Sequence, residues 1–226
     1  MKLYKIYSRA IGLLFALSLL CVGCENEDIL DINDLEISPS NPESVVIVEP
    51  DDGITSVNAL TKAINENGDA TYILRRDGVY YMEGKNVFKH NVVIKAENGS
   101  GKMPIIQPIC DAQGALNADM IRLEGSATFE NIYIIGKDAA TGNLMQRLFR
   151  IDESNVRLKF DNCFIDHCRN FCIRTDNVNN KIYLNNSTIR NLALTSDPAN
   201  GRLIDSRGNE QDSIAVSYTH LRAHET

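Results

Sequence analysis

Three arginines stand at equivalent places in three short, strand-like segments of this chain. They are Arg122 in Ile121-Arg-Leu123, Arg150 in Phe149-Arg-Ile151 and Arg174 in Ile173-Arg-Thr175. Two residues after each arginine comes an acidic residue, giving the series Glu124, Asp152 and Asp176. Because side chains alternate along a strand, each arginine and its acid are predicted to point to the same, outer side. If the segments stack in register, guanidinium groups form a column beside a column of carboxylates.

The two columns have two interpretations. Stacked like charges repel, so the acids can serve to neutralise the arginines, and the sequence favours this interpretation. Alternatively, the guanidinium groups bind the carboxylate or sulfate groups of an acidic sugar chain through paired hydrogen bonds. In that case Arg122, Arg150 and Arg174 are the candidate glycan-binding residues.

A second group of reactive residues is Cys163, Cys168 and Cys172, with Asp166 and His167 between them. The cysteine spacings of five and four fit no common zinc pattern, and we expect no metal site here. Core packing is the favoured role of Cys163. In an exported protein, the pairings Cys168–Cys172 and Cys163–Cys172 both stay open. We interpret Asp166 and His167 as a turn pair rather than an acid–base pair.

Other chemistry is not indicated by the sequence. It contains no Gly-rich phosphate loop, nucleophile elbow or nucleotide fingerprint, so no cofactor is identifiable. The net charge of −7 argues against nucleic acid as a partner, because phosphate binding needs a basic face. Cys110 is expected to be buried, and the oligomeric state is not indicated.

The segments that would position these side chains repeat along the chain. Three of them share an apolar residue, a spacer, an asparagine and then alternation: Phe129-Glu-Asn131-Ile132-Tyr-Ile134, Phe160-Asp-Asn162-Cys163-Phe-Ile165 and Leu184-Asn-Asn186-Ser187-Thr-Ile189. The asparagines are 31 and 24 residues apart. A repeat of this length built from short strands predicts an all-β solenoid in which the strands of neighbouring coils pair in parallel. A β-sandwich would explain the alternation but not the recurring asparagine.

Asn131, Asn162 and Asn186 are predicted to form a structural ladder. Asparagine tolerates the left-handed backbone of a tight turn, and stacked amides can hydrogen-bond from coil to coil. An earlier, looser copy of the motif is Phe88-Lys-His-Asn91-Val92-Val-Ile94. Leu203-Ile-Asp205 continues the arginine-bearing series, and its partner strand is expected beyond residue 215.

A short helix is predicted at the N-terminal end of the domain. Thr55 or Ser56 can cap this helix, apolar residues continue at helical spacing to Ile64, and Asn67-Gly68 ends it. The apolar run 45–48 can form a first strand.

Both ends of the chain are expected to lie outside the domain. Residues 1–23 have a basic start and a 14-residue apolar run, too short to span a bilayer, that ends at Gly23-Cys24. This pattern resembles a bacterial lipoprotein signal, which implies lipidation at Cys24 and a membrane anchor. The acidic cluster 25–28 opens a tether, residues 24–50, and resembles the surface-export signal of Bacteroidetes lipoproteins. The implied location is the outer membrane, exposed at the cell surface.

The last residues, 216–226, resemble a translated sequencing adapter. On this interpretation the His-x-x-x-His spacing of His220 and His224 is not a metal site. The β-helix domain, residues 51–215, is then incomplete at its C-terminal end.

Three features carry a wider resemblance: Thr71-Tyr-Ile-Leu-Arg-Arg-Asp-Gly-Val-Tyr-Tyr81, Asn91-Val-Val-Ile-Lys95 with Pro104-Ile-Ile-Gln107, and the asparagine repeats. In these the chain resembles the right-handed parallel β-helix group of pectin-lyase-like and chondroitinase B-like proteins and, more narrowly, an uncharacterised domain common in Bacteroidetes lipoproteins. The resemblance implies that the early helix caps the open N-terminal end of the core. It also implies an acidic polysaccharide as ligand, and lyase chemistry in which Lys and Arg act as base and acid and calcium neutralises the uronate. No residue here matches such a set, so we assign no catalytic residue.

Two function classes therefore stay open. One is a surface lipoprotein that binds, and in the enzymatic variant cleaves by β-elimination, an acidic polysaccharide. The other is a non-catalytic adhesin, glycan-capture or spacer solenoid.

Overall fold

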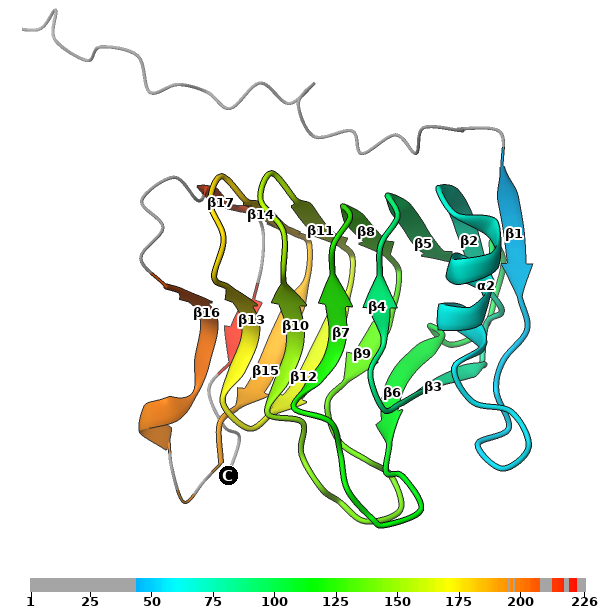
Figure 1. Cartoon of the computed structure of the whole chain (residues 1–226), viewed down its shortest axis with the longest axis horizontal. Coiled ribbons are helices and arrows are strands. Elements are labelled where there is room, and N and C mark those ends of the chain that lie inside the picture. Colours follow the sequence, from blue (N-terminus) through cyan, green and yellow to red (C-terminus); the bar gives the residue numbers. More distant parts are fainter. Residues whose placement is uncertain (1–43, 195, 197, 208–212, 218–219, 223–226) are drawn as a thin grey trace, which may run out of the picture. The chain divides into compact units, whose positions relative to one another are not determined.

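The chain winds into a parallel β-helix of about six turns. The computed structural model describes residues 44–194, 196, 198–207, 213–217 and 220–222. Each full turn contributes one strand to each of three sheets, and the strands of neighbouring turns pair in parallel (Figure 1). The predicted fold class is therefore confirmed.

The three sheets are named here by their strands. Sheet A contains β1 (Val45–Val48), β2 (Ala70–Leu74), β5 (Val92–Ala96), β8 (Ala127–Glu130), β11 (Arg157–Asp161), β14 (Lys181–Asn185) and β17 (Ser213–Ser217). Sheet B contains β3 (Val79–Glu83), β6 (Ile105–Ile109), β9 (Tyr133–Ile135), β12 (Phe164–Cys168), β15 (Thr188–Leu192) and β18 (His220–Arg222). Sheet C contains β4 (Val87–Phe88), β7 (Asp119–Leu123), β10 (Arg147–Ile151), β13 (Phe171–Thr175) and β16 (Arg202–Ser206).

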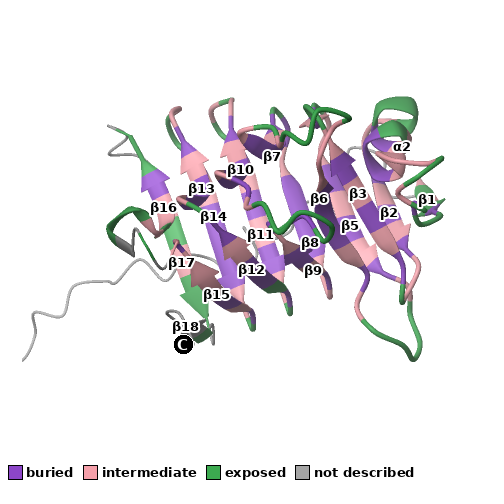
Figure 2. Ribbon diagram, turned by 90° about the horizontal axis from the view of Figure 1, so that it is seen from below, coloured by how far each residue is buried: buried purple, intermediate pink, exposed green. Residues whose placement is uncertain are grey.

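A single hydrophobic core runs between the sheets. In β2 and β5, buried and half-buried residues alternate strictly, as expected for strands with one face on the core (Figure 2). Phe129, Phe149 and Phe160 meet inside it, with ring centroids 5.2 to 5.4 Å apart. Because these rings come from neighbouring turns, no turn buries its apolar side alone.

The N-terminal end of the core is covered by helix α2 (Ala59–Asn67), which buries Leu60 and Ile64. The helix begins later than predicted. Thr55 and Ser56 do not cap it; their backbone N–H groups donate to Asp52 Oδ1, at 2.7 and 2.8 Å, in a separate loop. The predicted C-terminal end is right: Gly68, at φ 72°, donates its N–H to the Ile64 carbonyl at 2.9 Å.

The asparagine positions lie at the turns that join sheet A to sheet B. Asn131, Asn162 and Asn186 all have left-handed backbones, with φ of 58°, 50° and 47°. Asn162 Nδ2 donates to Asn131 Oδ1, so amide groups of neighbouring turns are joined. The looser copy at Asn91 is misplaced: Asn91 precedes β5, at the turn from sheet C to sheet A.

Two details near the C-terminal side differ from expectation. Ile204, not Leu203, pairs with Ile173, so Asp205 pairs with Arg174. The next strand, β17, covers Ser213–Ser217, and the expected boundary at residue 215 falls within it. A short 3-10 helix, η2 (Pro198–Asn200), precedes β16.

The predictions for the N-terminal part of the chain are only partly covered by the structure. The predicted strand at residues 45–48 is present as β1. The signal segment 1–23, Cys24 and the tether up to residue 43 lie outside the described residues. Among the described residues, none of the helices is both long and apolar enough to cross a membrane.

Candidate functional site

The three arginines singled out from the sequence form a column on the outer face of sheet C. Arg150 pairs in register with Arg122 on one side and with Arg174 on the other. All three side chains are half-buried, at 16 to 27 % exposure. The repeat therefore brings the guanidinium groups into adjacent turns, roughly 4.8 Å apart along the axis.

Each arginine of this column already has an aspartate partner. Arg122 pairs with Asp152 of the next turn. Arg150 lies between two carboxylates, with Nε 2.8 Å from Asp152 and Nη2 3.1 Å from Asp176. Arg174 closes the series at 2.9 Å from Asp176. The result is a zigzag in which each aspartate bridges two arginines.

The zigzag neutralises most of the column's charge. Burial raises the pKa of Asp176, but its hydrogen bond with Arg174 and the nearby Arg150 and Arg207 charges outweigh burial, and the net pKa lies below the ordinary value. Ionised aspartates between the arginines remove the repulsion that stacked like charges would create. The column is thus built to hold turns together, and little of its charge is left for a ligand.

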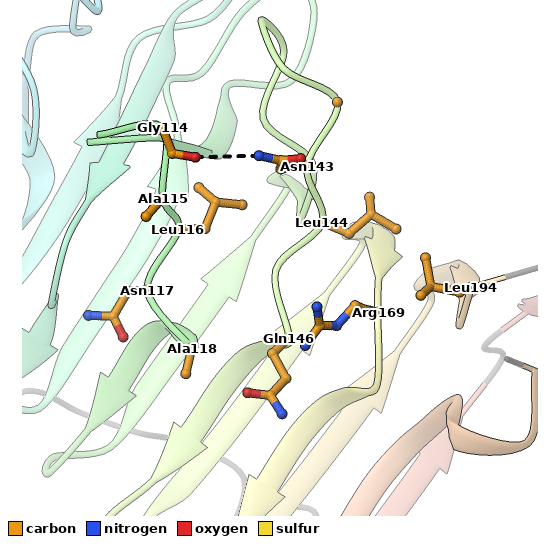
Figure 3. Close-up of a pocket in the computed structure, with 11 residues that line it drawn as sticks. Gly114, Ala115, Leu116, Asn117, Ala118, Asn143, Leu144, Gln146, Arg169 and Leu194 are labelled. Atoms are coloured by element: carbon orange, nitrogen blue, oxygen red, sulfur yellow. Dashed lines mark hydrogen bonds between the residues drawn. The ribbon is translucent and has the colours of Figure 1, made fainter. Parts of the chain in front are cut away.

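A different feature is open to a ligand, a cavity of about 620 Å³ at the corner between sheets B and C (Figure 3). We call it the corner groove. It is lined by residues of four successive turns: Gly114 to Ala118, Gly142 to Leu144 with Gln146, Arg169 and Leu194. At about 4.8 Å per turn the groove extends roughly 14 Å along the axis.

Two long loops form the walls of the corner groove. Residues 110–118 join β6 to β7, and residues 136–146 join β9 to β10, where the next turn needs only Arg169 and Asn170 to connect β12 with β13. Both loops extend from the same corner in Figure 1. Asn143 Nδ2 donates to the Gly114 carbonyl at 3.5 Å and so links the loops.

A buried carboxylate holds the second loop in place. Asp138 Oδ1 accepts hydrogen bonds from the Thr141 N–H at 2.6 Å and the Thr141 hydroxyl at 2.7 Å. Its other oxygen accepts the Cys110 N–H of the first loop at 3.1 Å. Burial raises the pKa of Asp138, but these hydrogen bonds outweigh burial and lower it overall. The groove walls are therefore pre-organised by an ionised aspartate.

The lining of the corner groove is made mainly of hydrogen-bonding groups. Asn117, Asn143 and Gln146 present amides, and Arg169 presents a guanidinium (Figure 3). Arg169 is exposed, and unlike the arginines of the column it has no carboxylate partner within the part of the chain that the structure describes. Amides and one available cation suit a polar ligand that carries a carboxylate.

Little in the amino-acid sequence predicts this groove. Its one signal was the length of the stretches between strands in two turns, which interrupts the repeat. Loop length predicts a functional loop but not what it faces.

The cysteines do not form a reactive site. Cys163, Cys168 and Cys172 are buried, and burial raises the pKa of Cys163 and Cys168 to about 12. None of the four cysteines that the structure describes is in a disulfide. Cys110 is only half-buried, contrary to expectation, because it opens the first groove loop. Within the described residues, no group of three or more His, Cys, Asp or Glu could hold a metal ion.

Comparison of the chain with protein-family models and with curated protein sequences gives no match.

Proposed function

We propose that this protein is a lipid-anchored surface protein whose β-helix binds an acidic polysaccharide in the corner groove. The lipoprotein-like start of the sequence supports the anchor at Cys24 and the outer-membrane location. The solenoid supports an extended ligand, because neighbouring turns repeat similar surfaces along one axis.

The observation that carries the proposal is Arg169 among the groove amides. Because no acidic partner of Arg169 lies among the described residues, its guanidinium can bind a uronate carboxylate with two hydrogen bonds. Asn117, Asn143 and Gln146, which belong to the two turns before Arg169, supply donors and acceptors for sugar hydroxyls on that side of the guanidinium. The long axis of the groove crosses four turns, which suits a chain-like ligand rather than a single small molecule.

The arginine column has a structural role in this proposal. Arg122, Arg150 and Arg174 would have to give up aspartate partners before they could bind a glycan carboxylate. Such an exchange of one carboxylate for another gains little free energy. We therefore place the acidic sugar at Arg169 and not on sheet C.

The test compares the two sites in the whole chain, purified in detergent. Affinity for polygalacturonate is measured by calorimetry for the wild type, for Arg169→Gln and for the triple variant Arg122→Gln, Arg150→Gln, Arg174→Gln. Loss of one charge-assisted contact of ~1.5 kcal/mol corresponds to roughly tenfold weaker binding for Arg169→Gln. Lys62→Gln on the exposed face of α2 removes the same charge elsewhere and serves as the control.

The triple variant decides between the sites. If the protein is folded and binding falls only in the triple variant, the glycan lies on sheet C and the groove proposal is wrong. If neither variant changes the affinity, or the wild type binds no acidic polysaccharide, the proposed function is wrong.

A further inference from the structure

A second polar site lies on the outer face of sheet B, around the carboxylate of Asp166. This side chain is only 2 % exposed, yet it faces outward from β12. It accepts hydrogen bonds from Tyr133 Oη at 2.8 Å, Arg190 Nε at 3.0 Å and Asn191 Nδ2 at 2.8 Å. The donors belong to the preceding and the following turn, so Asp166 joins three turns.

The Asp166 carboxylate stays ionised in this setting. Burial raises its pKa, but the hydrogen bonds from Asn191, Tyr133 and Arg190 outweigh burial, and the pKa lies below its ordinary value. Because all three donors bind this one ionised carboxylate, it fixes the orientation of each donor side chain. We call the Asp166 carboxylate together with these donors the hub. Asp166 is therefore a positioning residue for Tyr133, Arg190 and Asn191.

His167 is held beside this hub by an unusual backbone conformation. It has φ of 59° within β12, so the prediction of a turn pair with Asp166 is wrong. Its Nδ1 lies 2.8 Å from Asp166 Oδ1 and its side chain is one third exposed. A left-handed conformation in a residue other than glycine is costly and often marks a functional site.

An aromatic surface adjoins the polar hub. Phe164 is exposed at 39 %, although it is a large apolar residue in the middle of a sheet. Its ring lies 6.0 Å from the ring of Tyr133, edge to face, and the two residues pair in register across β12 and β9. Phe164 thus offers an open aromatic face two residues from Asp166.

We propose that Phe164, Tyr133, Arg190 and Asn191 form a binding site for a neutral pyranose ring. The apolar C–H face of a sugar packs on an aromatic ring, while its hydroxyls bind fixed polar groups at the ring edge. Arg190 is paired with Asp166 at 2.9 Å, so the hub is nearly neutral and gives no preference for a charged ligand. This sets the sheet-B site apart from the groove at Arg169.

The position of the site specifies the ligand further, and this step rests on the proposed function. Phe164 and Arg169 belong to the same turn, five residues apart, so at most ~18 Å of chain separates them. One polysaccharide can therefore contact both places if it carries uronate and neutral sugars within a few units of each other. The inferred ligand class is a mixed acidic and neutral polysaccharide rather than a polyuronate.

Three polymers separate these possibilities in calorimetric titrations of the whole chain. They are hyaluronan, which alternates uronate with a neutral sugar, polygalacturonate, which has only uronate, and an uncharged β-glucan. The wild type is expected to bind hyaluronan five- to tenfold more tightly than polygalacturonate. Phe164→Ala is expected to remove this preference and leave polygalacturonate binding within twofold of wild type. Phe164→Tyr keeps the ring and is expected to retain the preference.

Val178→Ala is the matched control, because Val178 is exposed to a similar degree but lies outside sheet B. If Phe164→Ala binds hyaluronan and β-glucan like the wild type, the sheet-B site is wrong, even when Arg169→Gln weakens polygalacturonate binding. If only the β-glucan binds and Phe164→Ala weakens it, the groove proposal fails and the sheet-B site stands. If no polymer binds, both are wrong.

Discussion

The Arg150 guanidinium reaches across one turn of the solenoid to the Asp176 carboxylate, 3.1 Å away, while it also contacts Asp152 of its own turn at 2.8 Å. Arg150 therefore has partners in two turns, and Asp152 and Asp176 each bridge two neighbouring arginines. Each turn of a solenoid contacts only the turns next to it. Ion pairs between neighbouring turns therefore stabilise the stack directly.

Asp152→Asn tests the stabilising role of the column. Asp152 bridges Arg122 and Arg150, and the substitution leaves two stacked guanidinium groups without the carboxylate between them. We expect the free energy of unfolding to fall by about 1–2 kcal/mol in urea titrations. The neighbouring exposed Glu153→Gln removes an equal charge and is expected to change stability by less than ~0.5 kcal/mol. Equal effects of the two variants would show that the bridge contributes nothing.

The asparagine ladder can be divided into a backbone part and a side-chain part at Asn162. Asn162→Gly keeps the left-handed turn at φ 50° but loses the amide bond to Asn131, and should cost about 1 kcal/mol. Asn162→Ala loses the same bond and also places a Cβ in the left-handed region, so it should cost ~1–2 kcal/mol more. Thermal and urea unfolding measure the stability of the wild type and of both variants, and the expected order is wild type, then glycine, then alanine. A more stable alanine variant would contradict the left-handed assignment.

Gly136 is required by close packing between turns. A Cβ added there would lie 2.0 Å from the His167 carbonyl oxygen and 2.4 Å from Leu148 Cδ2. Since backbone cannot move aside cheaply, Gly136→Ala should destabilise the fold by about 3 kcal/mol or more. Gly84→Ala is the comparison: nothing lies within 4 Å, so only the left-handed backbone at φ 67° costs free energy, about 1 kcal/mol. A larger loss of stability in Gly84→Ala than in Gly136→Ala would mean that the turns of Gly136 and His167 are not packed as described.

The Asp166 hub should contribute to the acid sensitivity of the protein. Its folded pKa is depressed below the ordinary value of 3.8, so its stabilising effect is complete above that pH and is lost as the pH falls through the folded pKa. Asp166→Asn is expected to be about 1–3 kcal/mol less stable than wild type at pH 7. The difference in the free energy of unfolding between the variant and the wild type should narrow below a pH of roughly 4. The exposed Glu66→Gln is the control, and a gap of constant size down to the lowest pH would contradict the prediction.

Regular features of this fold were predictable because they recur. The register of Arg122, Arg150 and Arg174 follows from strand alternation, and the left-handed asparagines follow from their place in each repeat. Where the pattern was ambiguous the prediction failed. Leu203 and Ile204 are both apolar, so alternation alone could not decide which one pairs with Ile173.

The candidate sites depend on contacts between turns that no repeat encodes. The corner groove exists because two loops of different length extend from the same corner and Asn143 links them through Gly114. The hub on sheet B exists because Asp166 meets donors from the turns on either side, which are 33 and 24 residues away in sequence. Local pattern showed Asp166 and His167 only as neighbours in the chain.

Hydrogen–deuterium exchange of the whole chain, with and without a saturating acidic polysaccharide, tests the location of binding most directly. Slower exchange in residues 110–118 and 136–146 is the result expected if the glycan lies in the corner groove. Protection confined to the sheet C strands that carry Arg122, Arg150 and Arg174, with both loops unchanged, would contradict the proposed site.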